Sequence, residues 1–262
     1  MKIESSGIIT NAKIKGSYYK VDFYSPEICA DVKPGQFVHL QILCLKDRIF
    51  RRPFSIFNVS DAGVLSIVYK VVGDGTESLS RLKPGMVCNL LGPLGNPYTT
   101  PSEDKTPILI TGGYGAAATY LLAKNSIKKG TLLIGARSKK DLLFVDDYKK
   151  LDFNVEIATE DGSAGETGMV TDLLKKHIAS DSLNNNAYYA CGPAGMMNVL
   201  MELFLKSDVE CELSLDHHMC CGVGACFACV VKVKDASKEQ GWSYARTCSD
   251  GPVFNSKKLF IG

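Results

Sequence analysis

The chain has 262 residues, 45% of them hydrophobic, which is enough for two modest domains and a small additional module. Thirty Lys and Arg residues against 28 Asp and Glu residues give a formal charge of +2, with no basic block that would neutralise nucleic-acid phosphates. The first ten residues lack the basic start and apolar run of a signal peptide, and no window approaches the roughly 20 apolar residues of a membrane span. We therefore expect a cytoplasmic protein without nucleic-acid or membrane partners.

The amino-terminal part of the sequence predicts an antiparallel β-barrel. Short runs rich in Val, Ile, Phe and Tyr alternate with turn signals such as Lys33-Pro34-Gly35 and Asp61-Ala62-Gly63. Strands this closely spaced are typical of an antiparallel barrel or sandwich. We assign residues 1–101 to a barrel domain, which ends in a polar, Pro-containing stretch.

The middle of the chain predicts a parallel sheet flanked by helices, because strand-like runs alternate with helical stretches from about Pro107. The expected strands are Ile108–Thr111, Thr131–Ala136, Asn154–Thr159 and Ala187–Ala190, and the expected helices are Ala116–Lys124, Met169–His177 and Gly195–Lys206. Residues 102–210 form this expected α/β domain. Residues 211–262 lack regular periodicity and are rich in Cys and Gly, so we expect a small module that a metal organises.

The cysteines are concentrated near the carboxyl end of the chain, where six of the ten occur from residue 211 onward. In a reducing compartment, metal binding or burial explains them better than disulfides. They include a C-x4-C-x2-C pattern with a fourth cysteine further on, the plant-ferredoxin spacing for a 2Fe-2S cluster. Gly222 and Gly224 let this loop curl around the sulfur atoms. The predicted cluster ligands are Cys221, Cys226, Cys229 and Cys248.

Other metal sites are also compatible with these residues. A structural zinc site of four cysteines is the main alternative, although zinc loops usually carry two C-x2-C knuckles and only Cys226 and Cys229 form one here. Counting from Cys220 would lengthen the first gap to five residues, so we interpret Cys220 as a free thiol. His217 and His218 allow a Rieske-like set, but four cysteines already complete the ligands.

Two segments of the barrel predict a flavin site. In the first, Arg52 can pair with a pyrophosphate, and Ser55 can reach the edge of a flavin ring. In the second, a glycine turn followed by Thr76 can present backbone amides to a phosphate, although an ordinary hairpin turn explains it equally well. The candidate FAD-binding residues are Arg52, Pro53, Phe54, Ser55, Tyr69, Val71, Gly73, Gly75 and Thr76.

The α/β part begins with a buried strand that runs into a glycine-rich loop and then a helix. This geometry offers free amides to the pyrophosphate of a nicotinamide nucleotide. A second strand-to-helix junction at Cys191 is also explained by Pro at a first helical turn, without a ligand. Tyr114 adds bulk where a phosphate would approach. The candidate nucleotide-binding residues are Gly112, Gly113, Gly115, Cys191, Gly192 and Pro193.

Together these motifs resemble the ferredoxin-NADP reductase superfamily, in which an R-x-x-S strand and a G-x-G-T turn hold FAD on a six-stranded barrel. The C-G-P stretch at Cys191 resembles the strand end that abuts the nicotinamide there, and Thr159–Gly165 resembles a loop beside the same crevice. One departure is that relatives usually carry three glycines in the first loop and an apolar-Ala-Pro sequence after it, whereas this chain has Tyr114 and then Ala116–Thr119.

The order of barrel, α/β half and cysteine module, with the ending Asp250-Gly251-Pro252-Val253-Phe254, resembles one family over essentially the full length. That family is the electron-transfer subunits of bacterial dihydroorotate dehydrogenase type B. The resemblance implies a relay in which a partner subunit oxidises dihydroorotate at an FMN, single electrons cross the 2Fe-2S cluster, and FAD delivers hydride to NAD+. It implies a heterotetramer with two copies of each subunit, and the surface around Cys226–Ala228 is expected near the subunit interface.

The relay needs no catalytic acid, base or nucleophile in this chain, and none is expected. Nicotinamide exchanges electrons in pairs, a cluster exchanges one, and a flavin does either, which explains the need for both cofactors. The same cofactors could instead serve another redox partner, such as a hydrogenase, a ferredoxin or a different flavoenzyme. A non-enzymatic redox sensor is a further alternative. NADH should bleach the flavin of an enzyme rapidly, but not that of a sensor.

Overall fold

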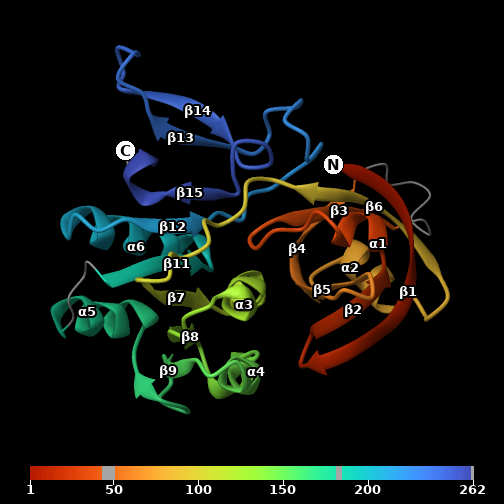
Figure 1. The fold of residues 1–262 in the computed structure, drawn as a ribbon, viewed down its shortest axis with the longest axis horizontal. Helices are drawn as coiled ribbons and strands as arrows, with labels where there is room; N and C mark the ends of the chain where they lie inside the picture. The colour runs from red at the N-terminus through yellow and green to blue at the C-terminus, as the bar shows by residue number, and fades with distance from the viewer. Residues whose placement is uncertain (43–50, 181–184, 261–262) are drawn as a thin grey trace.

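A closed, six-stranded antiparallel barrel forms the amino-terminal part of the computed structural model, which describes residues 1–42, 51–180 and 185–260 (Figure 1). The strands follow the order β1-β2-β5-β4-β3-β6 around the barrel. Their bounds are β1 Lys2–Lys15, β2 Tyr18–Tyr24, β3 Phe37–Gln41, β4 Arg52–Val59, β5 Val64–Lys70 and β6 Val87–Leu94. Two short helices, α1 (Pro26–Cys29) and α2 (Asp74–Ser80), lie in the connections from β2 to β3 and from β5 to β6. The predicted barrel is confirmed.

The barrel closes because alternate side chains of each strand point into a common apolar core. In β3, Val38 and Leu40 belong to this core and are fully buried. Phe37 and His39 take the opposite, outward face of the same strand. Both are nevertheless buried, which shows that another part of the chain covers this outer wall of the barrel.

A seven-stranded sheet with the order β10-β9-β8-β7-β11-β12-β15 forms the second part of the chain. All neighbours in it are parallel except β15, which runs antiparallel to β12. The strand bounds are β7 Thr106–Gly112, β8 Thr131–Ala136, β9 Asn154–Thr159, β10 Glu166–Thr167, β11 Asn186–Cys191, β12 Cys211–Ser214 and β15 Val253–Asn255. The predicted parallel sheet is therefore confirmed, and β8 and β9 have the expected bounds.

Helices cover both faces of this sheet. On one face, Ile108 and Ile110 of β7 pack with α5 and α6, whereas Leu109 packs with α3 and α4 on the other. The helices are α3 (Gly115–Asn125), α4 (Val145–Lys150), α5 (Val170–Ser180) and α6 (Ala194–Lys206), with short 3-10 turns at Lys139–Asp141 and Ser256–Lys258. No helix in the described part of the chain is long and apolar enough to cross a membrane.

The cysteine-rich segment leaves the large sheet after β12 and returns to it at β15. Between these two strands lies a separate antiparallel pair, β13 (Val230–Lys234) and β14 (Trp242–Arg246). The segment expected to form a separate module from residue 211 therefore begins and ends with strands that pair in the α/β sheet.

The barrel and the α/β part are joined through β4 and α3. Phe57 of β4 stacks on Tyr120 of α3, with ring centroids 4.5 Å apart, and Leu121 of α3 belongs to the barrel core. Lys124, near the end of the same helix, donates a hydrogen bond of 2.8 Å to Asn58 Oδ1. The predicted flavin strand and the helix after the predicted nucleotide loop are thus fixed to each other.

Candidate functional site

The four predicted cluster ligands lie in two turns on the side of the molecule that faces the barrel. Cys221, Cys226 and Cys229 are in the loop between β12 and β13, and Cys248 is in the turn between β14 and β15. Cys229 and Cys248 are buried, Cys221 is half-buried and Cys226 is exposed. The β13–β14 hairpin thus brings Cys248 back beside the three cysteines that precede it by 19 to 27 residues.

The thiols are arranged as two pairs. The side chain of Cys221 is hydrogen-bonded to that of Cys226, and the side chain of Cys248 to that of Cys229. Within residues 1–42, 51–180 and 185–260, no three His, Cys, Asp or Glu side chains gather around a point where one metal ion would sit. A 2Fe-2S cluster takes two ligands on each of two irons, so paired sulfur donors fit this group.

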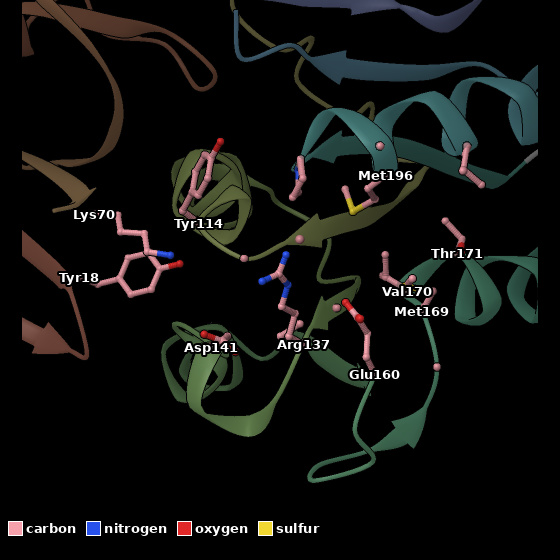
Figure 2. A pocket seen from close by; sticks show the side chains of 18 residues that line it. Tyr18, Lys70, Tyr114, Arg137, Asp141, Glu160, Met169, Val170, Thr171 and Met196 are labelled. Carbon is pink, nitrogen blue, oxygen red and sulfur yellow. The ribbon is translucent and has the colours of Figure 1, made fainter. Parts of the chain in front are cut away.

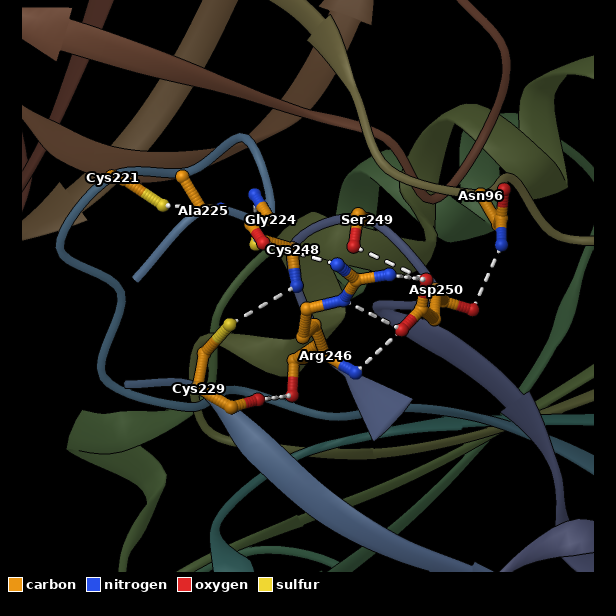
Figure 3. A network of polar contacts seen from close by, with 10 residues as sticks. Asn96, Cys221, Gly224, Ala225, Cys229, Arg246, Cys248, Ser249 and Asp250 are labelled. Carbon is orange, nitrogen blue, oxygen red and sulfur yellow. Dashed lines mark hydrogen bonds and ion pairs between the residues drawn. The ribbon is translucent and has the colours of Figure 1, made fainter. Parts of the chain in front are cut away.

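Backbone amides of the loop point at the sulfur atoms (Figure 3). Ala225 N donates to Cys221 Sγ over 3.3 Å, and Gly224 N donates to Cys248 Sγ over 3.2 Å. Burial raises the pKa of the Cys221 thiol, but hydrogen bonds from the backbone of Val223, Cys226 and Ala225 and from the Cys226 side chain outweigh it and lower the pKa to about 6. The loop therefore favours the thiolate, which is the form that binds iron.

Two glycines give the loop this shape. Gly222 and Gly224 have φ values of +72° and +81°, a region that side chains rarely adopt. A Cβ atom at Gly224 would also lie 2.9 Å from Ser249 Oγ. The expectation that these glycines let the loop curl is confirmed.

An ion pair holds the Cys248 turn and the cysteine loop together (Figure 3). Arg246 donates from Nε to Asp250 Oδ2 over 3.0 Å and from Nη2 to Asp250 Oδ1 over 3.1 Å, which is a bidentate contact. Its Nη1 also donates to the backbone oxygen of Gly224 over 3.1 Å. Arg246 therefore connects the turn carrying the fourth cysteine to the loop carrying the first three.

The cysteine segment rests on the outer wall of the barrel. Cys229 and Cys248 form one buried apolar cluster with barrel residues, and Met219 of the loop completes it. The barrel residues of this cluster are Phe37, Leu91 and Leu94. Burial and the neighbouring Cys229 sulfur raise the pKa of Cys248 to about 12, so this thiol stays protonated until a metal replaces the proton.

The two predicted flavin segments meet in the structure. A Cβ atom at Gly75 would lie 3.4 Å from Arg52 Nε, so the Arg52 side chain lies against the first turn of α2. Thr76 Oγ1 accepts hydrogen bonds from the amides of Val72 and Gly73, at 2.9 and 3.3 Å. The Arg52 guanidinium therefore lies beside the glycine segment that Thr76 holds in place. A binding site for a pyrophosphate needs both a positive charge and backbone amides.

The conformation of this second segment differs from the expectation. The stretch Gly73–Thr76, expected as a glycine turn, opens the seven-residue helix α2, with Gly73 as its N-cap. The hairpin turn that was the alternative is therefore wrong. The amides at the start of the helix still point outward, because the first turn of a helix leaves them without intrahelical partners.

The remaining flavin candidates divide by burial. Ser55 is exposed and Pro53 is half-buried, so both are placed where a ligand can reach them. Tyr69 is buried in the barrel core, and its hydroxyl donates to Asn11 Oδ1 over 2.9 Å. Phe54 contacts the Tyr69 ring edge-on, and Val71 packs against the same core. The roles of these residues remain predictions.

The nucleotide candidates lie at a cavity of about 570 Å³ between the barrel and the carboxyl ends of the parallel strands (Figure 2). Gly112, Gly113 and Pro193 line it. Gly115 and Gly192 are not among its lining residues, and Gly192 lines a separate cavity of about 270 Å³. A Cβ atom at Gly115 would come within 2.0 Å of the Cys191 backbone oxygen. These glycines allow the two strand-to-helix junctions to touch, and ligands in open α/β sheets bind at such strand ends.

Tyr114 also lines this cavity, with its hydroxyl tied to another part of the chain. Its hydroxyl donates a hydrogen bond of 2.6 Å to Asp216 Oδ2, just before the cysteine loop, and Figure 2 shows it pointing away from Arg137. Burial and Asp216 raise the pKa of Tyr114 above its ordinary value, so the phenol remains a donor. The nucleotide loop and the cysteine segment are linked by this contact.

Several residues of the cavity were not predicted from the sequence. Arg137 follows β8 and points its guanidinium toward the glycine loop, while Tyr18 and Lys70 reach the cavity from the barrel. Arg137 could have been found from its position directly after a parallel strand, where side chains meet the ligand crevice. Tyr18 and Lys70 carry no such local signal. His217 and His218 are exposed, and His217 lines a separate cavity of about 270 Å³.

Comparison with known proteins identifies the relatives of this chain. Residues 216–260 match the model of the iron-sulfur cluster binding domain of dihydroorotate dehydrogenase B, and residues 109–202 match the oxidoreductase NAD-binding domain. The dihydroorotate dehydrogenase B (NAD(+)) electron transfer subunit of Desulforamulus reducens is 38% identical, over 97% of both chains. That of Fusobacterium nucleatum is 35% identical over the full length of both.

This chain belongs to the family of dihydroorotate dehydrogenase B electron transfer subunits. It is therefore an oxidoreductase subunit that acts with a separate catalytic partner, and the resemblance seen in the sequence is confirmed. A chain from the NADH-dependent reduced ferredoxin-NADP oxidoreductase structure, described for flavin-based electron bifurcation, has a TM-score of 0.83 and 30% identity, and the match covers 97% of this chain and 89% of that one. A ferredoxin reductase of carbazole 1,9a-dioxygenase shares the fold, with a TM-score of 0.68 and 20% identity, over 79% and 66% of the two chains.

The Arg246–Asp250 pair predicts a specific response to acid. The hydrogen bonds from Arg246 hold the pKa of Asp250 below its usual 3.8, so the contribution of the charged pair to stability is complete above that pH and is lost as the pH falls through the lowered pKa. We expect Asp250→Asn to be less stable than the wild type at about pH 6, with the difference shrinking as the pH falls below 3.8. Urea unfolding of both proteins at each pH measures this. A difference that is independent of pH would contradict it.

The position of Arg137 in the cavity predicts a role in nucleotide binding. Removing a charge-assisted contact in Arg137→Ala should raise the Kd for NADH about tenfold or more. Titration of flavin fluorescence or calorimetry with NADH provides the measurement. Lys140→Ala is the matched control, because Lys140 is exposed on the following turn and does not line the cavity. Equal affinities in the two variants would rule out the role of Arg137.

Proposed function

We propose that this chain relays electrons between the FMN of a dihydroorotate-oxidising partner subunit, its own 2Fe-2S cluster, FAD and NAD, in the conversion of dihydroorotate to orotate for pyrimidine biosynthesis. Cys221, Cys226, Cys229 and Cys248 hold the cluster. FAD lies along Arg52–Ser55 and α2, and NAD occupies the cavity beside Gly112 and Gly113. The relay operates in the cytoplasm, in a heterotetramer with two copies of each subunit.

The observation that carries this proposal is the shared wall between the cysteine segment and the barrel. Phe37 of β3 is buried in one apolar cluster with Cys229 and Cys248. Its partner in the barrel sheet is Ser55 of the flavin segment, on the neighbouring strand β4. One barrel residue therefore contacts the cluster ligands and neighbours the flavin strand. A cluster and a flavin bound on either side of this wall would be held next to the same barrel strand, which supports electron exchange between them.

When bound, nicotinamide exchanges an electron pair as hydride, the cluster exchanges single electrons, and the flavin joins the two. The chain itself binds and orients these groups. The Arg52 guanidinium can form two hydrogen bonds at once and in this way holds the pyrophosphate. The backbone amides of the cysteine loop surround the cluster sulfurs. The Phe57–Tyr120 stack and Leu121 keep the flavin strand fixed to the helix of the nucleotide loop.

The partner subunit docks on the exposed rim of the cysteine loop. Phe227 and Val223 are 58% and 44% exposed, and Cys226 is also on the surface. Phe227 has φ of +57°, which is unusual for a bulky residue, and the Arg246 guanidinium lies 5.2 Å from its ring centroid. An apolar side chain held outward beside a cluster ligand suits an electron-transfer contact with a protein partner.

A second candidate function keeps the cofactors but changes the partner. The likeness to the chain from NADH-dependent reduced ferredoxin-NADP oxidoreductase favours it, because that match also extends over nearly the whole chain. In that case the chain serves as an NAD(P)H-dependent reductase subunit for a ferredoxin or another flavoenzyme. Reconstitution with the FMN subunit distinguishes the two functions. Dihydroorotate oxidation should then reduce NAD+ in the first case, and no such coupling should occur in the second.

The anaerobically purified protein should contain one FAD, two irons and two sulfides per chain. The visible spectrum, together with chemical analysis of iron, sulfide and flavin, measures this content. In Cys226→Ala we expect the cluster absorbance to disappear while FAD stays bound, because the barrel holds the flavin independently. Cys220→Ala, which alters the adjacent thiol, is the matched control and should retain the cluster. Wild-type protein that contains neither iron nor flavin would contradict the proposed function.

The contact between Arg52 and α2 predicts that Arg52 anchors FAD. Arg52→Ala should weaken FAD binding by about 1.5 to 3 kcal/mol, because a charge-assisted contact to phosphate is lost. Flavin retained after dialysis measures the effect. Arg81→Ala is a suitable control, since Arg81 pairs with Glu77 on the exposed side of the same helix region. Unchanged flavin content in Arg52→Ala would exclude this role.

A further inference from the structure

His39 is a buried polar residue that no part of the proposed relay yet uses. It lies in the middle of β3 on the outward face of the barrel, two residues from Phe37. In the barrel it is paired with Pro53 of the flavin strand on one side and with Leu91 on the other. His39 therefore belongs to the wall that separates the flavin strand from the cysteine segment.

The imidazole of His39 is enclosed by protein. The residue is 1% exposed, and within the described part of the chain neither Nδ1 nor Nε2 has a hydrogen-bond partner. A buried polar group without a partner costs free energy, so such a side chain in the interior calls for an explanation. A barrel strand that needed only an apolar contact here would carry Leu or Val, as at the neighbouring positions Val38 and Leu40.

The part of the chain that covers His39 is the start of the cysteine loop. A Cβ atom at Gly222 would lie 2.5 Å from His39 Nδ1 and 2.9 Å from its Cε1. The backbone of Gly222 therefore lies directly on the ring, and only glycine allows this approach. The backbone of Cys221 also interacts with the ring, and this interaction favours the protonated imidazole, as a carbonyl acceptor would.

The charge of this histidine is fixed by its surroundings. Burial, followed by the charges of Arg51 and Arg52, outweighs the Cys221 backbone and lowers the pKa of His39 to about 4. Arg51 donates to the backbone oxygens of both His39 and Asn89, at 3.2 and 2.9 Å, so β3 is also held firmly to β6. An imidazole carries at least one N–H donor whether it is neutral or protonated, and here that donor lies on a strand that is held in place.

We propose that His39 is a positioning residue that docks the first turn of the cysteine loop onto the barrel, through its N–H and the Cys221 backbone carbonyl, and so sets the spacing between cluster and flavin. This inference rests on the proposed function. His39 is not a metal ligand in it, because the four cysteines complete the cluster. Gly222 is the matching feature of the loop, since it lets the backbone reach the imidazole.

The argument for spacing follows from what His39 joins. Its strand neighbour Pro53 lies in the flavin segment, and its ring contacts the residue next to Cys221. The apolar cluster at Phe37 holds the other end of the segment, at Cys229 and Cys248, and does not include Cys221 or Cys226. In the described part of the chain, the approach of Gly222 to the His39 ring joins the exposed half of the loop to the barrel.

The test compares His39→Leu with His39→Asn in the complete, cofactor-loaded protein. Leu and Asn have the same branched shape, but only Asn keeps an N–H donor near the position of Nδ1. In His39→Leu we expect amide hydrogen exchange at residues 221–226 to rise about fivefold, because the proposed hydrogen bond to the Cys221 backbone cannot form. The cluster EPR spectrum should change, and cluster reduction after flavin reduction by NADH should slow. His39→Asn should restore all three.

Controls separate docking from general stability. FAD content and the rate of flavin reduction by NADH should stay at wild-type values in both variants, and His177→Leu, a histidine removed on the distant helix α5, should change none of the readouts. If His39→Leu loses FAD or fails to fold, Gly222→Ala tests the same contact from the loop, and it should show the faster exchange and altered EPR spectrum. Wild-type exchange and EPR in Gly222→Ala would overturn the proposal.

Two results distinguish this inference from the proposed function. If the wild-type cluster is reduced through the flavin and His39→Leu matches it in exchange, EPR and rate, the docking role is wrong and the relay stands. If NADH never reduces the wild-type cluster, the proposed function fails, and the exchange measurement alone then decides whether His39 holds the loop. Equal behaviour of the Leu and Asn variants, both unlike the wild type, would show that ring volume matters and that the hydrogen bond does not.

Discussion

The packing of the cysteine segment against the outer wall of the barrel is the interaction on which the rest of the arrangement depends. Barrel strands normally send their outward side chains to solvent, yet Phe37, Leu91 and Leu94 are buried there together with Cys229 and Cys248. The contact removes water from two of the four sulfur donors and places them beside the strand pair β3–β4. A metal centre and a flavin strand thus share one rigid support, and no flexible linker separates them.

A second contact of the same kind fixes the other side of the flavin strand. Phe57 and Tyr120 stack across the boundary between the barrel and the α/β part, and Leu121 of α3 enters the barrel core. The helix that begins at the nucleotide loop is therefore an extension of the barrel packing. The hydrogen bond from Tyr114 to Asp216 joins that loop to the start of the cysteine segment. Nucleotide, flavin and cluster regions are consequently linked pairwise, which suits a relay that depends on fixed distances.

Much of this architecture could be predicted from local sequence patterns. Strand β8 has a continuous apolar run after Thr131, and β9 has apolar residues interrupted by Glu156; the ends of both strands agree with the expected bounds. The cysteine spacing pointed to the cluster because ligand geometry restricts it tightly. The segment at Gly73 was misjudged, because a seven-residue helix is too short to show a helical period. Resemblance to a known family, and not periodicity, supplied the number of barrel strands.

Features formed by tertiary contacts left little trace in the sequence. Lys70 reaches the nucleotide cavity only because the barrel lies against the strand ends, and His39 is one polar residue within an ordinary apolar strand. The sequence placed the bulk of Tyr114 at the nucleotide loop but did not show that Asp216, a residue far along the chain, holds its hydroxyl. In each case the partner is distant in sequence, so no local pattern could indicate it.

The return of the chain to the large sheet at β15 has a consequence for how the protein acquires its metal. Because β12 and β15 are adjacent in the sheet, both ends of the iron-binding excursion are pinned by main-chain hydrogen bonds that involve no sulfur. Closing a loop whose ends are already held together costs little further entropy. Delivery of iron and sulfide can then follow folding, and a chain whose cluster has been destroyed by oxygen keeps the scaffold needed for repair in place.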